Sequence, residues 1–358
     1  MKILVPDHYS ERDLREIRAV SPELETAKLN IKWNNGTLWR IARKLSHKLL
    51  PDQERWQHLF NSRQRSMNFL MDGKSLSQAG KDVDILLCSW VITGDILINL
   101  LPFLPNLKWI HSTVTDVYHI LFAELIKSNI ILTSSIGVHS TRVAEFVLAL
   151  MLNIAKKIPG HLDLQRKRRW QSIQAEELKG KIVGIIGYGH IGREVAKRAQ
   201  AFEMKVMAIK RSYTKSENGV IVLHSSNLRE LLKTCDFLVI SAPLTKETKG
   251  MIGEIELSIM KKEAYVINIS RGGIVDEKAL IKALKENWIA GACLDVLVEQ
   301  PLRRDSPFYS LPNVVITHRS AYFSPNSQRE IFNLFLTNLK RFIAGEKLLC
   351  IVDKEKGY

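Results

Sequence analysis

Residues 187–192 read Gly-Tyr-Gly-His-Ile-Gly, a G-x-G-x-x-G pattern between a β-branched run and a helical pattern. The run at 181–187 predicts a buried strand, and residues 192–202 have the apolar spacing of a helix. A glycine turn between such elements lets a pyrophosphate approach the backbone and the helix N-terminus. The pattern therefore predicts a dinucleotide-binding α/β domain that contacts its cofactor through Gly187, Tyr188, Gly189, His190, Ile191 and Gly192.

Strand and helix patterns alternate along most of the chain, which is typical of βαβ units and a parallel sheet. The 358 residues have room for about two domains at ~100–200 residues each. We expect strands at 2–5, 84–88, 107–110, 130–132, 181–187, 205–209, 237–241, 263–269, 291–296 and 314–317. We expect helices at 141–157, 192–202, 228–234 and 277–286.

The composition limits the classes of function. A net charge of +15 favours anionic partners, although charge alone does not choose among a phosphorylated cofactor, an acidic substrate and nucleic acid. No apolar run reaches the ~18 residues that cross a bilayer, and the first residues lack a signal-like apolar run, so we expect a cytoplasmic protein without a membrane partner. No C-x-x-C pair occurs, and no metal site is expected; three of the cysteines are expected in the core, among Cys88, Cys235, Cys293 and Cys350.

Two basic stretches interrupt the strand–helix alternation. Residues 31–70 are rich in Lys, Arg and Trp, and we interpret them as a solvated helical insertion, with a binding arm as the alternative. Residues 166–170 read Arg-Lys-Arg-Arg-Trp and are expected to form a solvated connector. Neither stretch carries a recognised nucleic-acid motif, so nucleic-acid binding is not expected.

The end of the strand at 205–209 bears on the choice of cofactor. NAD-selective sites place Asp or Glu at this point, on the ribose hydroxyls. This chain has Lys210, Arg211 and Ser212 instead. Two cations and a hydroxyl suit the 2′-phosphate of NADP(H), which we favour; NAD(H) is the alternative if both cations only face solvent.

Together with the glycine motif, three further motifs resemble the D-isomer-specific 2-hydroxyacid dehydrogenase family. They are Pro-Leu-Thr at 243–245 with Thr248, Asn-Ile-Ser-Arg-Gly-Gly at 268–273, and Gly-Ala-Cys-Leu-Asp-Val at 291–296. The resemblance covers residues 84–358 and is densest at 181–317. It adds to the expected cofactor-binding residues Pro243, Thr248, Ile269, Ser270, Arg271 and Asp295.

The resemblance implies two Rossmann-like domains with doubly wound parallel sheets. A dinucleotide-binding domain at 141–319 is inserted into a discontinuous substrate domain formed by residues 1–140 and 320–358. The implied activity is an NAD(P)-dependent oxidoreductase that transfers a hydride between nicotinamide and a small, anionic 2-keto or 2-hydroxy acid. Family members are mostly homodimers, and we expect the same here.

The family uses three catalytic side chains: an Arg for the substrate carboxylate, a His that moves the hydroxyl proton, and a Glu that raises the pKa of the His. The family motif places the Arg at Arg271, and its guanidinium suits a planar carboxylate. Gln300 stands where the Glu is expected, and His318 and Arg319 replace the Pro-His pair. An Arg is a poor proton donor near neutral pH. The candidate catalytic residues are Arg271, Gln300, His318 and Arg319.

The expected substrate loop also departs from the family. Thr115 and Asp116 replace an Ala-Gly pair whose backbone N–H groups receive the carboxylate in the family, alongside Arg271. The negative charge of Asp116 indicates a remodelled pocket, and it could pair with Arg319. Two classes of function remain open: an active oxidoreductase with an altered substrate, and a catalytically impaired dinucleotide-binding protein that acts as a partner-binding module.

Overall fold

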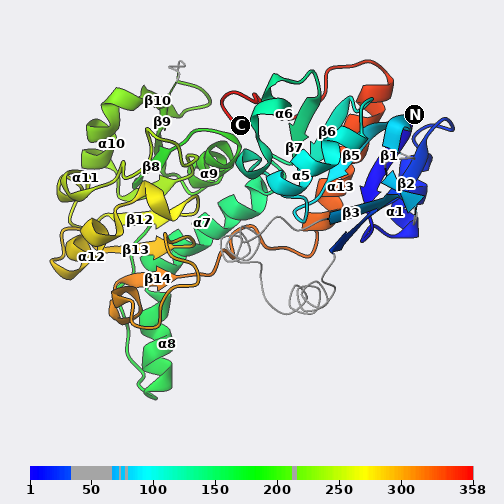
Figure 1. The fold of residues 1–358 in the computed structure, drawn as a ribbon. Helices are drawn as coiled ribbons and strands as arrows, with labels where there is room; N and C mark the ends of the chain where they lie inside the picture. The colour runs from blue at the N-terminus through cyan, green and yellow to red at the C-terminus, as the bar shows by residue number, and fades with distance from the viewer. Residues whose placement is uncertain (34–66, 72–73, 77–79, 212–215, 358) are drawn as a thin grey trace. The chain divides into compact units, whose positions relative to one another are not determined.

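The computed structural model describes residues 1–33, 67–71, 74–76, 80–211 and 216–357 (Figure 1). The chain divides into two units, each with its own sheet and core. Unit 1 comprises Met1–Val138 and Asn326–Tyr358, and unit 2 comprises His139–Pro325. The two parallel-sheet α/β units, one of them discontinuous in sequence, confirm the predicted fold class.

Unit 2 contains a fully parallel sheet in the order β10-β9-β8-β11-β12-β13-β14. The order reverses between β8 and β11, the neighbours at its centre, and ligands of such sheets bind at the carboxyl ends beside this point. The strands are β8 (Ile182–Ile186), β9 (Lys205–Lys210), β10 (Ile221–His224), β11 (Phe237–Ile240), β12 (Tyr265–Asn268), β13 (Gly291–Leu294) and β14 (Val314–Ile316).

Helices cover both faces of this sheet (Figure 1). Along β8, Val183 and Ile185 join the core beneath α7 and α9, whereas Ile186 joins the core beneath α10, α11 and α12. Alternation of side chains across the strand therefore supplies both layers. The helices are α7 (Ser140–Ala155), α8 (Ile158–Arg166), α9 (His190–Ala201), α10 (Leu228–Thr234), α11 (Glu254–Ser258) and α12 (Glu277–Lys285), with short 3-10 turns at η4 (Ser225–Asn227), η5 (Gly272–Ile274) and η6 (Pro307–Ser310).

Unit 1 has a mixed sheet in the order β4-β3-β2-β1-β5-β6-β7, parallel except where β3 pairs with β2 and β4. The strands are β1 (Lys2–Pro6), β2 (Glu25–Trp33), β3 (Met67–Met71), β4 (Lys74–Ser75), β5 (Val83–Cys88), β6 (Trp109–Ser112) and β7 (Ile131–Ser134). The helices are α1 (Glu11–Arg18), α5 (Gly94–Leu100), α6 (Ala123–Lys127) and α13 (Ser327–Ile343), with 3-10 turns at η1 (Gly80–Asp82), η2 (Leu101–Phe103) and η3 (Tyr118–Ile120).

The return segment completes the core of unit 1. Phe335 of α13 is fully buried, and its ring lies 5.5 Å from that of Trp109 on β6. Asn338 donates to the carbonyl of Leu349 at 3.0 Å and accepts from its N–H at 2.7 Å. The ammonium of Lys354 donates to three carbonyls at the end of α6 and just beyond it, those of Leu125, Ser128 and Ile130, at 2.6–3.1 Å.

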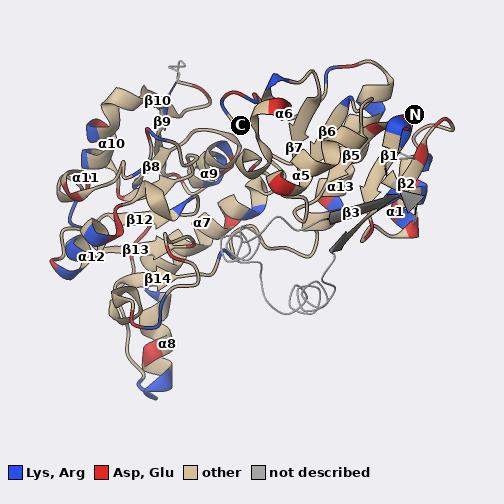
Figure 2. Ribbon diagram, in the orientation of Figure 1, with Lys and Arg blue, Asp and Glu red and all other residues tan. Residues whose placement is uncertain are grey.

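Several sequence expectations can be compared with this fold. Arg166 is the last residue of α8, a helix that the sequence analysis did not predict, and residues 167–170 are exposed beyond it (Figure 2). Most of the basic region at 31–70 lies outside the described residues. Among the described residues, no helix has both the length and the apolar character needed to span a bilayer. As expected, three cysteines are buried: Cys88, Cys235 and Cys293.

Candidate functional site

The glycine loop joins β8 to α9 at the centre of the unit 2 sheet. Gly187 has φ +97°, and a Cβ there would lie 2.5 Å from the backbone nitrogen of Ala242. Gly192 packs equally closely, because its Cβ would lie 2.4 Å from the carbonyl oxygen of Gly187. At Gly189, by contrast, a Cβ would meet no described atom within 4 Å. The loop is therefore tightly packed inside and open beside the first residues of α9, which fits a pyrophosphate group.

The other residues of this motif differ in exposure. Tyr188 is only 4% exposed, and its ring packs in the core below the loop. The guanidinium of Arg193 lies 5.2 Å from the ring centroid, and its Nε forms an ion pair with Glu217 at 3.1 Å. His190 is exposed at the start of α9, and Ile191 is half-buried. Tyr188 thus supports the loop by packing, while the backbone of the motif remains available to a ligand.

The cations expected to select the cofactor follow β9. Lys210 is half-buried as the last residue of β9, and Arg211 is exposed directly after it, whereas Ser212 lies outside the described residues. The pKa of the Glu247 carboxyl is lowered first by a hydrogen bond from the Thr245 hydroxyl, and the positive charge of Arg211 lowers it further. Arg211 therefore lies near the turn at 243–248.

Hydrogen bonds shape two turns at the carboxyl ends of β11 and β12. The Thr248 hydroxyl donates to the carbonyl of Pro243 at 2.7 Å and accepts from the N–H of Thr245 at 2.7 Å. The hydroxyl of Ser270 donates to the carbonyl of Ala242, which links the second turn to the end of β11. Ile269 is buried, and its N–H donates to the carbonyl of Ile240 at the end of β11 at 3.4 Å. These contacts bring the predicted residues at 243–248 and 269–270 to one edge of the sheet.

Arg271 follows β12 and is half-buried. Its Nη1 donates to the carbonyl of Ser270 at 2.8 Å, and its own carbonyl accepts from the Asn268 amide at 3.0 Å. Gly272 allows the loop after β13 to approach its backbone closely, since a Cβ at this position would lie 2.1 Å from the backbone carbonyl carbon of Leu297. Arg271 is thus held at the same edge as the loop after β13.

Asp295 holds the loop that follows β14. Asp295 is only 3% exposed, and its carboxylate accepts a hydrogen bond from the Thr317 hydroxyl at 2.6 Å. It also accepts from the N–H groups of Ser320 at 2.7 Å and Ala321 at 3.2 Å. Arg319, between these residues, has φ +48°, which is uncommon for a residue other than glycine. The conformation of residues 317–321 therefore depends on one buried carboxylate.

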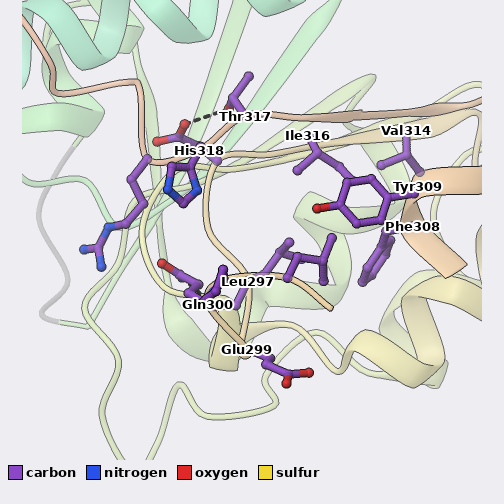
Figure 3. Close-up of a pocket in the computed structure, with 13 residues that line it drawn as sticks. Leu297, Glu299, Gln300, Phe308, Tyr309, Val314, Ile316, Thr317 and His318 are labelled. Carbon is purple, nitrogen blue, oxygen red and sulfur yellow. Dashed lines mark hydrogen bonds between the residues drawn. The ribbon is translucent and has the colours of Figure 1, made fainter. Parts of the chain in front are cut away.

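A pocket of about 520 Å³ opens beside this loop, at the ends of β13 and β14 (Figure 3). It brings together three of the four candidate catalytic residues, Gln300, His318 and Arg319. Gln300 donates to the carbonyl of Leu297 at 2.6 Å, and His318 is exposed. The remaining lining residues are Asp295, Leu297, Glu299, Pro301, Leu302, Phe308, Tyr309, Val314, Ile316 and Thr317.

One residue that positions this pocket was missed by the sequence analysis. Glu277, the first residue of α12, accepts from the N–H of Val298 at 2.6 Å, which fixes the loop that leads to Gln300. Burial raises the pKa of the Glu277 carboxyl, and the nearby charges of Glu299 and Asp276 raise it further. No sequence pattern marks this contact, because it joins positions 21 residues apart.

The two expected substrate-loop residues lie in unit 1. Thr115 and Asp116 are both exposed after β6. The carboxylate of Asp116 accepts from the N–H of Tyr118 at 3.1 Å, so it shapes its own loop. Its pairing with Arg319 of unit 2 stays a prediction.

Comparisons with known proteins agree on one family. The sequence model for the NAD binding domain of D-isomer specific 2-hydroxyacid dehydrogenases matches residues 148–321. Glyoxylate reductase from Thermofilum pendens is 36% identical over 283 residues, which cover 77% of this chain and 83% of that protein. Glyoxylate reductase from Thermococcus litoralis is also 36% identical, with 77% and 85% covered.

Solved structures share the fold over the whole chain. A D-isomer specific 2-hydroxyacid dehydrogenase from Xanthobacter autotrophicus Py2, in complex with NADPH and MES, gives a TM-score of 0.72 at 24% identity and covers 99% of each chain. A second structure is an NADPH-dependent glyoxylate/hydroxypyruvate reductase from Sinorhizobium meliloti in complex with NADP and sulfate. Its TM-score is 0.72 at 22% identity, and the match covers 100% of this chain and 99% of that chain.

Proposed function

Since this chain belongs to the D-isomer specific 2-hydroxyacid dehydrogenase family and is an NAD(P)-dependent oxidoreductase, we propose that it reduces a 2-keto acid with NADP(H). The products are the 2-hydroxy acid and NADP⁺, with one proton taken up at the carbonyl oxygen. The observation that carries the proposal is the shared edge of the unit 2 sheet, where the glycine loop, Arg271 and the pocket at Gln300 and His318 follow neighbouring strands. The glyoxylate reductases among its relatives support an anionic keto acid as the substrate.

In this proposal the backbone from Gly187 to Gly192 holds the pyrophosphate, and Lys210 and Arg211 hold the 2′-phosphate. The turns at 243–248 and 269–270 would also contact the cofactor, which would supply the hydride when bound. Arg271 binds the substrate carboxylate through paired N–H groups. Asp295 keeps the loop with His318 and Arg319 in place.

We assign the proton to His318, the one histidine among the residues that line the pocket, because histidine is the usual side chain for proton transfer in catalysis. Gln300 carries no charge, so it cannot act as the glutamate that assists the catalytic histidine in the family. We therefore expect slow turnover on pyruvate and glyoxylate, at least about 100-fold below a typical family enzyme, since a well-tuned general acid contributes about 10²–10⁴-fold.

The test is NADPH oxidation with a panel of 2-keto acids that includes glyoxylate and hydroxypyruvate, and Arg271→Ala as the inactive control. His318→Ala should abolish turnover and leave NADPH affinity unchanged. Fast reduction of glyoxylate that is insensitive to His318→Ala would contradict the assignment. NADPH binding without reduction of any keto acid would favour the alternative, a catalytically impaired partner-binding protein, which the replacements at Gln300 and Arg319 suggest.

The cofactor preference is tested separately by binding. NADPH should bind at least about 10-fold more tightly than NADH, a difference of about 1.4 kcal/mol. Lys210→Asp combined with Arg211→Ala should reverse this preference, because it replaces a cation with the carboxylate that suits a free ribose. Equal affinities in the unmodified protein would refute the assignment. A homodimer and a cytoplasmic location stay predictions, open to light scattering and cell fractionation.

A further inference from the structure

The carboxyl end of edge strand β10 lies beside the end of β9, where the 2′-phosphate of the cofactor is proposed to bind (Figure 1). The two strands are parallel, and their register pairs His224, the last residue of β10, with Lys210, the last residue of β9. Neighbouring strands of a sheet are about 4.8 Å apart. The backbone of His224 therefore lies one strand spacing away from that of Lys210.

The side chains of Lys210 and His224 also lie on the same face of the sheet. In β9, Ala208 belongs to the core beneath α7 and α9, and its register partner Val222 in β10 belongs to the same core. Lys210 and His224 are each two residues further along their strands, so the alternation of side chains places them on this face as well. This is the face of α9, whose first residues follow the glycine loop.

One nitrogen of the His224 ring is held by the turn that follows β10. Its Nδ1 accepts from the N–H of Ser226 at 3.3 Å and lies 3.0 Å from the hydroxyl of the same residue. A histidine ring that accepts at Nδ1 carries its proton on Nε2. The residue is exposed, and none of the described residues accepts a hydrogen bond from Nε2. His224 thus offers an N–H donor at the carboxyl edge of the sheet.

A phosphate at this edge can use more donors than the two cations assigned to it. A phosphate monoester presents three acceptor oxygens and carries about two negative charges. Arg211 lies near the Glu247 carboxylate, which offsets part of its positive charge. Hydrogen bonds to an ionised acceptor are shorter and stronger than those between neutral groups. An additional N–H donor beside Lys210 would therefore stabilise the bound phosphate.

From this arrangement we propose that His224 is a further cofactor-binding residue, whose Nε2–H donates a hydrogen bond to the 2′-phosphate of NADP(H) next to Lys210. The inference rests on the proposed preference for NADP(H), and it makes His224 a determinant of that preference. NAD(H) has a hydroxyl in place of this phosphate, so its binding does not depend on the contact. The contact takes no part in the transfer of hydride or proton.

Calorimetry with NADP⁺ and with NAD⁺ tests the contact without turnover. His224→Ala should lower the affinity for NADP⁺ at least about 10-fold, because a hydrogen bond to an ionised group is lost. It should leave the affinity for NAD⁺ unchanged, which also shows that the variant is folded. The matched control is His161→Ala, at an exposed position on α8, which should change neither affinity.

Two variants of equal length keep the test decisive if His224→Ala does not fold. His224→Gln retains an N–H donor and should keep most of the affinity for NADP⁺. His224→Glu places a negative charge beside the phosphate and should weaken NADP⁺ binding selectively. An equal loss of NADP⁺ and NAD⁺ affinity, or a preference for NADP⁺ that survives both His224→Ala and His224→Glu, would overturn the proposal.

The same titrations separate this inference from the proposed cofactor preference. Equal binding of NADP⁺ and NAD⁺ by the unmodified chain would refute the preference itself, and the contact with it. If Lys210→Asp with Arg211→Ala abolishes a preference for NADP⁺ that the His224 variants leave intact, only the role of His224 is refuted.

Discussion

His111 should make unit 1 sensitive to acid. The residue is fully buried on β6, and its Nδ1 lies 2.7 Å from the hydroxyl of Thr133, which also accepts from Trp109 Nε1 at 2.8 Å. The Nε2 atom has no hydrogen-bond partner among the described residues. Burial lowers the pKa of His111 from 6.5 to about 3. The folded chain thus keeps this imidazole neutral over most of the acidic range.

The sign and size of the effect follow from linkage. As pH falls below 6.5, the unfolded chain binds a proton that the folded chain does not bind until about pH 3, so stability is lost as pH falls. Each pH unit below 6.5 in this window lowers the free energy of unfolding by about 1.4 kcal/mol, so about 2 kcal/mol of it is lost by about pH 5. His111→Phe keeps a ring beside Phe335 but cannot be protonated, so it should remove this loss.

Urea unfolding, followed by tryptophan fluorescence at about pH 7.5 and about pH 5, measures the difference between the two proteins. Between these two pH values, the free energy of unfolding of His111→Phe should rise by about 2 kcal/mol relative to that of the unmodified chain. His8 and His119, whose pKa values are also lowered by partial desolvation, are present in both proteins, so their contributions cancel. His161→Phe, at an exposed position on α8, is the matched control. A stability difference between the His111→Phe and unmodified chains that is the same at both pH values would refute the reasoning.

Three further substitutions probe the loop and the return segment. Gly187→Ala should abolish NADPH binding in calorimetry, because the new Cβ collides with the backbone at Ala242 and φ is +97°. Lys354→Met should lower the free energy of unfolding by about 1–3 kcal/mol in urea, since it leaves carbonyl groups without their donor. Asn338→Leu should lower the free energy of unfolding at least as much, because the N–H and the carbonyl of Leu349 both lose their hydrogen-bond partner. An unchanged urea midpoint for Lys354→Met or Asn338→Leu would contradict the corresponding prediction.

The dinucleotide-binding fold of unit 2 could be predicted because the sequence signals for its strands lie within short segments of the chain. The run at 181–187 forms β8 (Ile182–Ile186). Like β8, the other strands of unit 2 are apolar segments that differ clearly from the loops between them. The helix expected from residue 192 begins two residues earlier, at His190, within the glycine motif itself. Similarly, the strand expected at 107–110 lies at Trp109–Ser112. Boundaries shift where the deciding contacts are tertiary.

Other elements were missed for two different reasons. β2 mixes charged and apolar residues, and its partner β3 begins more than 30 residues later, so their pairing is not visible in either segment. α13 does carry a readable signal, because Ile331, Phe335 and Leu339 recur every four residues on its buried face. A closer search for helical periodicity would have found it.

The candidate site shows the same limit at the level of side chains. The motifs identified Asp295 as a cofactor-binding residue, but they did not reveal that its carboxylate holds Thr317 and Ser320. Nor did they indicate that Gln300 turns toward the carbonyl of Leu297. Such contacts depend on how separate loops meet in three dimensions, which spacing along the chain does not encode.

The divided architecture of unit 1 also determines when it can fold during synthesis. Its first part, residues 1–138, leaves the ribosome well before α13, because the whole of unit 2 is made in between. At about 5–20 residues per second, that interval lasts on the order of 10–40 s. During this time Trp109 and its neighbours lack the covering supplied by Phe335 and Phe342. The nascent chain therefore carries an uncovered apolar sheet face for many seconds, a natural binding site for chaperones, while the contiguous unit 2 folds first.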